Sequence, residues 1–151
     1  MTAQIGDVLT YQDKHYSMAT EPLKPYLEFI NFKEFSAPHT ACWRGYIGSW
    51  IIKENHLFLN HLKAYIKNNI EVDLNYLFPD QLEIFAYWFN GKIFLPHGEL
   101  LQYHHAGYAS VYEKTMILEF ENGILISKSY RTNNIKEDDY RDFNNNDNLP
   151  F

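Results

Sequence analysis

Hydrophobic and polar residues alternate along much of the 151-residue chain in short segments, a pattern typical of half-buried strands. Residues 8–11 and 15–18 alternate in this way on either side of a polar turn, and they predict a small opening hairpin. Residues 43–53 form a longer alternating segment, and residues 57–66 return after a second polar turn. The pattern therefore predicts antiparallel strands joined mostly by tight turns.

Two Asn-Gly pairs, Asn90-Gly91 and Asn122-Gly123, lie between segments rich in aromatic and branched residues. Asn and Gly accept the positive φ that both central residues of a type I′ turn require, and this turn suits antiparallel strands. The second pair predicts a hairpin of residues 115–130. One of its faces is expected to carry the apolar residues Met116, Leu118, Phe120 and Leu125.

The region before the first Asn-Gly pair fits two structures. Asp80 and Glu83 have the spacing of a helix capping box, and apolar residues follow at helical spacing. Alternatively, residues 84–95 form a hairpin that places Trp88 opposite Ile93 and Ala86 opposite Leu95. We favour the hairpin, because an aromatic run leads straight into Asn90-Gly91.

Residues 43–53 and 57–66 each present one predominantly apolar face. In the first segment this face is Tyr46, Gly48, Trp50 and Ile52, and in the second it is Phe58, Leu62, Ala64 and Ile66. Gly45 and Gly48 within a strand indicate a bulge, or a place where another group approaches the backbone closely.

The remaining segments complete a mostly β fold. Residues 26–35 are irregular or form one short helix, and Asp73 caps a helical turn that ends before Pro79. We expect an antiparallel hairpin meander that forms a barrel or sandwich, with one or two short helices. Residues 1–131 are one β-rich domain, and residues 132–151 are an acidic, Asn-rich tail expected to be disordered or loosely attached.

The composition narrows the function classes. The 13 basic and 19 acidic residues give a net charge of −6, which disfavours a nucleic-acid partner because such binding depends on Lys and Arg. No apolar segment approaches the roughly 20 residues of a membrane-spanning helix, and the N-terminus has no signal-peptide pattern, so we expect no membrane partner and a cytoplasmic location. Cys42 is the only cysteine and can form no internal disulfide.

Arg44 is the first candidate binding residue, since it lies among aromatic residues. It could hold a carboxylate or phosphate of a ligand, stack on Trp50 or Trp88, or pair with an internal acid. The sequence does not distinguish these roles. The aromatic candidates grouped with it are Trp43, Tyr46, Trp50 and Trp88.

A second candidate cluster surrounds His105, which could act as a general base if a carboxylate oriented its ring. Its other members are Tyr103, Tyr108, Tyr112 and Glu113. Half-buried tyrosines are the simpler interpretation, since no nucleophile is evident beside them. His97, His104 and His105 match no standard metal-ligand spacing, and we expect no metal and no cofactor.

Four segments together resemble a family of small bacterial proteins that has no assigned function. They are Cys42-Trp43-Arg44-Gly45-Tyr46 with Trp50, Leu77-Phe78-Pro79, residues 85–91, and the segment from His105 to Glu113. The resemblance covers residues 40–126 and excludes the tail. Tyr87, where the family pattern has an acidic residue, and His104, where it has an apolar one, depart from it. The resemblance implies no substrate and no reaction.

No phosphate-binding loop, nucleophile elbow or zinc-protease motif is present, so no enzyme class is indicated. The abundant aromatic residues suit a recognition surface. We expect a non-enzymatic interaction protein, an acidic accessory or immunity-type protein that binds a basic protein partner. The alternative is a small enzyme or a carrier of a small molecule, with an aromatic pocket that uses Arg44 and His105. A homodimer formed through the apolar 84–95 hairpin is a third arrangement.

Overall fold

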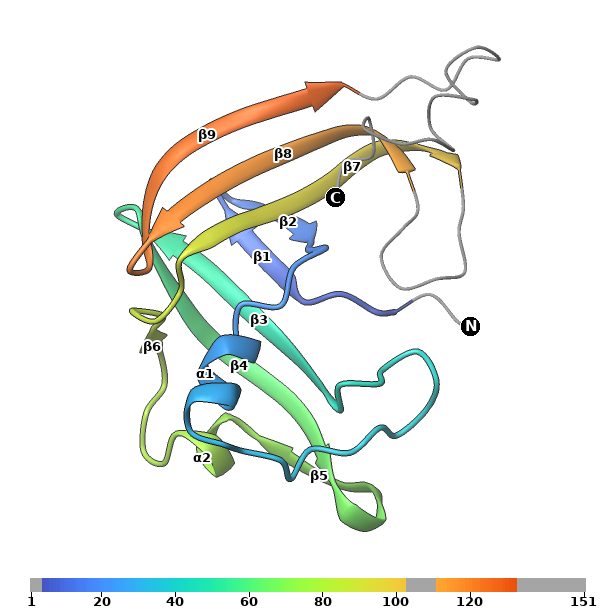
Figure 1. Ribbon diagram of the computed structural model, residues 1–151, viewed down its shortest axis with the longest axis vertical. Coiled ribbons are helices and arrows are strands. Elements are labelled where there is room, and N and C mark those ends of the chain that lie inside the picture. Colours follow the sequence, from blue (N-terminus) through green and yellow to red (C-terminus); the bar gives the residue numbers. More distant parts are fainter. Residues whose placement is uncertain (1–3, 103–110, 133–151) are drawn as a thin grey trace.

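A computed structural model describes residues 4–102 and 111–132 (Figure 1). Its two α-helices and one 3₁₀ turn are α1 (Lys24–Phe29), α2 (Leu74–Leu77) and η1 (Lys67–Asn69). Its strands are β1 (Val8–Tyr11), β2 (Lys14–Ser17), β3 (Tyr46–Lys53), β4 (His56–Ile66), β5 (Ile70–Asp73), β6 (Ile84–Phe85), β7 (Gly91–Gln102), β8 (Val111–Glu121) and β9 (Ile124–Thr132). The mostly β fold with short helices is confirmed. The expectation for the tail lies outside the described residues.

The described strands form one nine-stranded sheet in the order β2-β1-β3-β4-β9-β8-β7, with β5 and β6 attached to β4. Neighbouring strands are antiparallel except β1 and β3, which are parallel. The start of the chain departs from the predicted antiparallel meander. There β1 pairs with β2 in an antiparallel hairpin, but it pairs with β3 in parallel.

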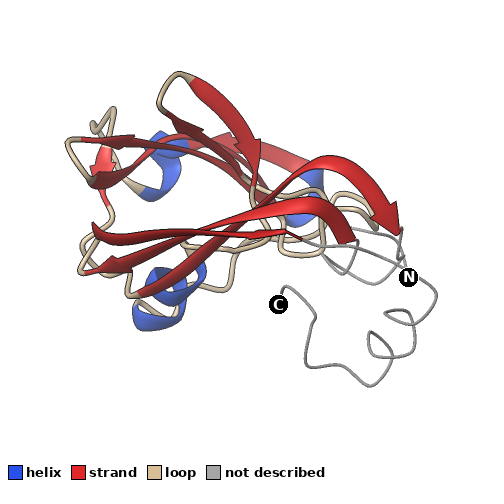
Figure 2. Ribbon diagram, turned by 90° about the horizontal axis from the view of Figure 1, so that it is seen from above, coloured by secondary structure: helices blue, strands red, loops and turns tan. Residues whose placement is uncertain are grey.

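The sheet folds over into two layers, which Figure 2 shows stacked from above. At one edge β4 and β9 share a single residue pair, His56 with Ile124, supported by backbone hydrogen bonds between Leu57 and Gly123 and between Leu125 and Asn55. At the other end of the strand order, Ala19 N donates to Phe94 O of β7. The contact at Ala19 is not a strand ladder, so the structure is a sandwich-like sheet and not a closed barrel.

Alternate residues of the strands fill the space between the layers. Completely or almost completely buried side chains come from both layers: Leu9, Trp50, Leu57, Leu59, Leu62, Ile93, Leu95 and Leu118. On β8 the predicted face of Met116, Leu118 and Phe120 is buried, and Leu125 of β9 packs against the same core. Burial of these side chains, each contributing roughly 1.5–3 kcal/mol, holds the layers together.

Three hairpin loops of two residues have positive φ at both of those residues, as a type I′ turn requires. They are Gln12-Asp13, Glu54-Asn55 and the predicted Asn122-Gly123 pair. Each joins two antiparallel neighbours: β1 with β2, β3 with β4, and β8 with β9. The hairpin predicted at Asn122-Gly123 is confirmed.

A bulge in β4 changes which of its residues face the core. Ser49 of β3 pairs with His61, but Trp50 pairs with Leu59, so Asn60 is an extra residue on β4. The alternation therefore shifts by one position at Asn60. Leu57 and Leu59 are buried before the bulge, and Leu62 and Ala64 after it. The expectation that Phe58 shares the face of Leu62 was wrong for this reason.

The predicted hairpin of residues 84–95 was also wrong. Ile84 and Phe85 form β6, which pairs with β4, whereas β7 pairs with β8 from Gly91 onward. Trp88 does not lie opposite Ile93, since Ile93 pairs with Leu118. The Trp88 indole N–H instead donates to Pro22 O at 2.7 Å. The long β8 offers a far longer ladder to β7 than the short segment 84–89 could.

The two Asn-Gly pairs lie next to each other in space. The Asn90 side-chain oxygen accepts a hydrogen bond from Asn122 N at 2.8 Å, and Gly123 N donates to Phe89 O at 2.8 Å. The first pair thus does not form its own turn but supports the second. This contact fixes the connection from β6 to β7 against the corner where the layers meet.

We expect Gly123→Ala to lower the free energy of unfolding by about 3 kcal/mol or more. Gly123 has φ +79°, and a Cβ there would lie 2.4 Å from Ala86 O, so strain and a steric clash add together. Gly91→Ala is the matched control, with φ +141° and its nearest atom 3.9 Å away, and we expect it to cost about 1–2 kcal/mol. Equal losses in urea unfolding would contradict the close approach of Gly123 to Ala86.

Candidate functional site

The structure describes the Arg44 cluster but not the cluster around His105. Tyr103, His105 and Tyr108 lie outside the described residues, as does His104. Tyr112 and Glu113 lie in β8, and their side chains are likewise outside the description. The binding role suggested for the His105 cluster therefore stays a prediction.

Arg44 and the aromatic residues grouped with it lie at different depths. Tyr46 and Trp50 of β3 are buried, whereas Trp43, just before β3, is 48% exposed. Trp88 is half-buried in the connection between β6 and β7. These residues do not line one pocket. Trp50 and Tyr46 belong to the core, and only Trp43 and Trp88 reach the surface.

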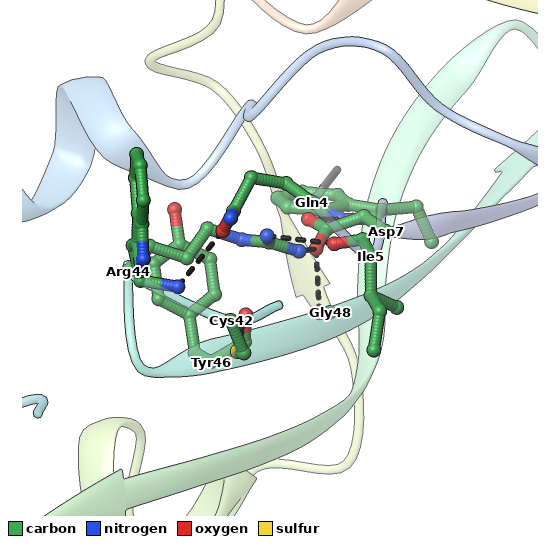
Figure 3. A network of polar contacts seen from close by, with 9 residues as sticks. Gln4, Ile5, Asp7, Cys42, Arg44, Tyr46 and Gly48 are labelled. Carbon is green, nitrogen blue, oxygen red and sulfur yellow. Dashed lines mark hydrogen bonds and ion pairs between the residues drawn. The ribbon is translucent and has the colours of Figure 1, made fainter. Parts of the chain in front are cut away.

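Asp7 is the partner of Arg44 (Figure 3). The Asp7 side chain is completely buried, and its Oδ1 lies 2.6 Å from Arg44 Nη2. Gly48 N also donates to Oδ1 at 2.9 Å, and the Trp50 indole N–H donates to Oδ2 at 2.9 Å. Both carboxylate oxygens are therefore satisfied by protein groups, as a buried charge requires.

Arg44 is held on several sides. Its Nη1 donates to Ile5 O at 2.8 Å, and its guanidinium carbon lies 5.1 Å from the centre of the Tyr46 ring. Its side chain is only 9% exposed. Of the roles left open by the sequence, the structure shows the internal ion pair, with a ring contact to Tyr46 beside it. Sequence reasoning had not singled out Asp7, because its partner is distant along the chain.

The absence of side chains at two glycines permits close approaches, at Gly48 within this network and at Gly45 beside it. A Cβ at Gly48 would lie 3.2 Å from Asp7 Oδ2 and 3.0 Å from Trp50 Nε1. A Cβ at Gly45, where φ is +79°, would lie 2.7 Å from the backbone of Ser36. The close backbone approach predicted at these glycines is confirmed. The predicted alternative, a bulge, is found nearby but on β4.

The surroundings of Asp7 change the pKa of its carboxyl in opposing ways. Burial raises the pKa of the Asp7 carboxyl above its usual value, and the Arg44 charge and the hydrogen bonds from Gly48 and Trp50 oppose that rise. The Gln4 side chain adds two hydrogen bonds to this network: its amide nitrogen donates to Thr40 O, and its amide oxygen accepts from Trp43 N, both at 2.8 Å. The network therefore anchors residues 4–7 to β3 and to the loop before it.

A different surface gathers exposed aromatic and apolar side chains around α1 and the connection from α2 to β7. Tyr26 of α1 contacts Trp88 with ring centres 4.7 Å apart, and Trp88 contacts Tyr87 at 5.4 Å. Phe78 completes the ring cluster beneath them, 5.1 Å from Tyr26. We call the exposed part of this surface the aromatic face. It comprises Tyr26, Tyr87 and Trp88, which the ring contacts join, together with the exposed Phe29 and Leu82, which lie on the same elements.

Three side chains of the aromatic face are mostly exposed to solvent. Phe29 is 84% exposed, Leu82 is 90% exposed and Tyr87 is 58% exposed. Phe29 lies one turn after Tyr26 on the same side of α1. Exposed apolar groups of this size gathered in one region are typical of interaction surfaces.

Three carboxylates, those of Glu28, Asp80 and Glu83, lie on the same elements as the aromatic face, and we call them its acidic surround. Residues 74–90 contain Asp80 and Glu83 but no Lys or Arg, whereas α1 carries Lys24 as well as Glu28. Glu83 also pairs with Lys53 at 2.7 Å. The pKa of Tyr26 is raised by burial and by the neighbouring Tyr87, so its hydroxyl stays neutral. The face therefore combines apolar anchors with an acidic surround.

Other chemistry-bearing residues lie apart. Cys42 is buried, with its Sγ 3.6 Å from Tyr46 O. Within residues 4–102 and 111–132, no group of three or more His, Cys, Asp or Glu side chains is placed to hold a metal ion. The helices in these ranges are all too short or too polar to cross a bilayer.

Comparison of the chain with protein-family models, curated proteins and solved structures finds no match in any of the three. The resemblance to a bacterial family stays a prediction.

We expect Arg44→Met to lower the free energy of unfolding at pH 7 by roughly 3–5 kcal/mol, because it leaves the Asp7 carboxylate buried without its counter-charge. Loss of Arg44 raises the pKa of Asp7 further, so protonation relieves the variant as the pH falls. The loss should therefore be smaller at pH 5 than at pH 7, as urea unfolding at both values would show. Lys53→Met removes an exposed ion pair and should cost no more than about 1 kcal/mol at either pH.

Proposed function

We propose that this protein is a non-enzymatic interaction protein, of accessory or immunity type, that binds a basic protein partner through the aromatic face. The observation that supports this most is the exposure of Phe29, Leu82 and Tyr87 within an acidic surround. A side chain exposed to this degree contributes little to folding, and burying it against a partner would be favourable.

The two kinds of residue on this face have different roles in the proposed contact. Aromatic and large apolar side chains act as anchors, because they bury much area at low entropic cost. The carboxylates of Glu28, Asp80 and Glu83 act at longer range and steer a basic protein toward the face. Trp88 is already fixed by its bond to Pro22 O, so part of the face is ordered before binding.

The ligand-carrier or enzyme alternative depends on Arg44 and His105 converging on one pocket. Arg44 is engaged with Asp7 and Ile5 O, which leaves this alternative without its exposed cation. The interaction function needs neither residue, and it is therefore our choice.

A double substitution should remove the proposed contact without unfolding the protein. We expect Leu82→Ser combined with Tyr87→Ala to weaken partner binding at least tenfold, because two anchors are lost. Ile70→Ser on β5, where the side chain is 53% exposed, is the matched control and should bind like the wild type. Native mass spectrometry of protein purified from its own host identifies the bound species, and titration of that partner measures the change.

The result that would remove this proposal is a partner whose affinity is the same for the double variant and the wild type. A bound small molecule in place of a protein would support the carrier alternative instead. Circular dichroism and urea unfolding establish that both variants remain folded.

We expect the association rate with the basic partner to fall by about tenfold or more between low salt and about 0.5 M salt, because ions screen the acidic surround. Glu28→Gln with Asp80→Asn should reduce this salt dependence while leaving the dissociation rate little changed. Stopped-flow or surface-based kinetics measures both rates. A rate that does not change with salt would contradict electrostatic steering.

A further inference from the structure

We propose that an open cavity on the outer face of β3 and β4 binds a free aromatic amino acid whose ring carries an N–H or O–H group. The cavity has a volume of about 460 Å³, within the roughly 300–1,000 Å³ usual for small-molecule sites. It is lined by Lys53, Glu54, His56 and Phe58. None of these four residues belongs to the aromatic face, so an amino acid bound here leaves that face free for a protein.

The alternation of the strands places the lining side chains on the outer face of the sheet. Leu57 and Leu59 are completely buried in the core, so His56 and Phe58 point away from it. Lys53 of β3 is the direct partner of His56 across the hairpin, and it therefore shares this outer face. The register of the hairpin thus brings the three side chains together at one end of the two strands.

Aromatic rings form the apolar part of the site. Phe85 of β6 pairs with Phe58 of β4, and the centres of their rings are 5.8 Å apart. The His56 ring lies 5.1 Å from that of Phe85 and stacks with that of Phe58 at 6.4 Å. All three side chains are half-buried, so part of their ring surface is left for the ring of a ligand.

His56 supplies a hydrogen-bond acceptor beside these rings. Its Nδ1 lies 2.7 Å from Glu54 O, and a carbonyl oxygen can only accept, so Nδ1 carries the hydrogen. In the neutral ring Nε2 is then an acceptor, and no group of the described residues donates to it. The hydrogen bond from Nδ1 also holds the orientation of the ring. An indole N–H or a phenol O–H on the ligand complements this acceptor.

An exposed ion pair at the rim of the cavity complements the two charges of a free amino acid. Lys53 Nζ lies 2.7 Å from Glu83 Oε1 and 5.2 Å from the centre of the Phe58 ring, so both charges stand next to the apolar surface. The two side chains are 50% and 33% exposed, so the pair contributes little to folding and exchanges partners easily. The α-carboxylate of the ligand would contact Lys53, and its α-ammonium would contact Glu83.

The adjacent opposite charges favour a zwitterion over other small molecules. A ligand with only a carboxylate would be attracted by Lys53 but repelled by Glu83, and a ligand with only an amine would meet the reverse. A residue within a peptide has neither end group, because both are used in amide bonds. The ion pair therefore distinguishes a free amino acid from an aromatic side chain of a protein partner.

Calorimetric titration of the full chain with three matched probes tests this assignment. We expect L-tryptophan to bind about tenfold more tightly than N-acetyl-L-tryptophanamide, which keeps the indole but lacks both charges. In 3-benzothienyl-L-alanine a sulfur replaces the indole N–H while both charges stay. This probe should bind about fivefold more weakly than L-tryptophan, because the hydrogen bond to His56 is lost.

Substitutions in the cavity assign each contact to a residue. Lys53→Met with Glu83→Gln should weaken binding of L-tryptophan about tenfold and leave that of N-acetyl-L-tryptophanamide as in the wild type. His56→Phe should reduce the affinity for L-tryptophan to that for 3-benzothienyl-L-alanine, and leave the latter unchanged. Lys67→Met with Glu71→Gln makes the same charge changes on other exposed side chains and should bind all three probes like the wild type. Circular dichroism establishes that each variant is folded.

The variant that lacks two anchors of the aromatic face, Leu82→Ser with Tyr87→Ala, should bind L-tryptophan like the wild type. Loss of binding in this variant would overturn the proposal, because the probe would then occupy the aromatic face. Equal affinities of the wild type for L-tryptophan and N-acetyl-L-tryptophanamide would overturn the choice of a free amino acid. Absence of L-tryptophan binding at millimolar concentration would overturn the site itself and leave the proposed protein contact unaffected.

Discussion

The burial of the Asp7 carboxylate is the constraint on which the layer that contains β1 and β3 depends. Moving an unpaired carboxylate out of water costs several kcal/mol or more, so it must meet a cation and hydrogen-bond donors where it lies. Arg44, Gly48 N and the Trp50 indole supply these. Because Asp7 immediately precedes β1 and its donors lie on or before β3, the two strands are brought side by side. The single parallel pair of the sheet is thus linked to this network.

The second constraint is the corner where the two layers meet. Gly123 approaches Ala86 and donates to Phe89 O, while Asn90 accepts from Asn122 N. These contacts hold residues 86–90 against the β8–β9 turn. The same connection carries Tyr87 and Trp88, and Leu82 lies just before β6, so this part of the aromatic face is positioned by the packing of the corner. A substitution at Gly123 would therefore disturb the position of this surface as well as the packing of the core.

The charged residues of the chain are not evenly distributed. Residues 74–90 carry Asp80 and Glu83 and no Lys or Arg, whereas β9 carries Lys128 and Arg131 and no acidic residue. A basic protein steered toward the first region would be repelled by the second, which would favour one orientation of an approaching partner.

Several features depended only on neighbouring residues, and the sequence by itself determined them. The turn at Asn122-Gly123 was predictable because the positive φ it needs is a property of those two residues. The cap by Asp73, whose side chain accepts from Asn75 N, was predictable because cap and helix are adjacent. The buried face of β8 followed from its alternation.

Tertiary structure decided the features in which a residue chooses among distant partners. Asn90-Gly91 has the same local preference as Asn122-Gly123, yet β7 pairs with β8, because a long ladder and a shared core outweigh one turn. Arg44 could have served a ligand, but Asp7, 37 positions away, is buried beside it. Asn60 shifts the face of β4, so that Leu59, opposite Trp50, and Leu62 are both buried in the core. In each case the deciding interaction joins segments that local sequence does not connect, so only the folded chain brings them together.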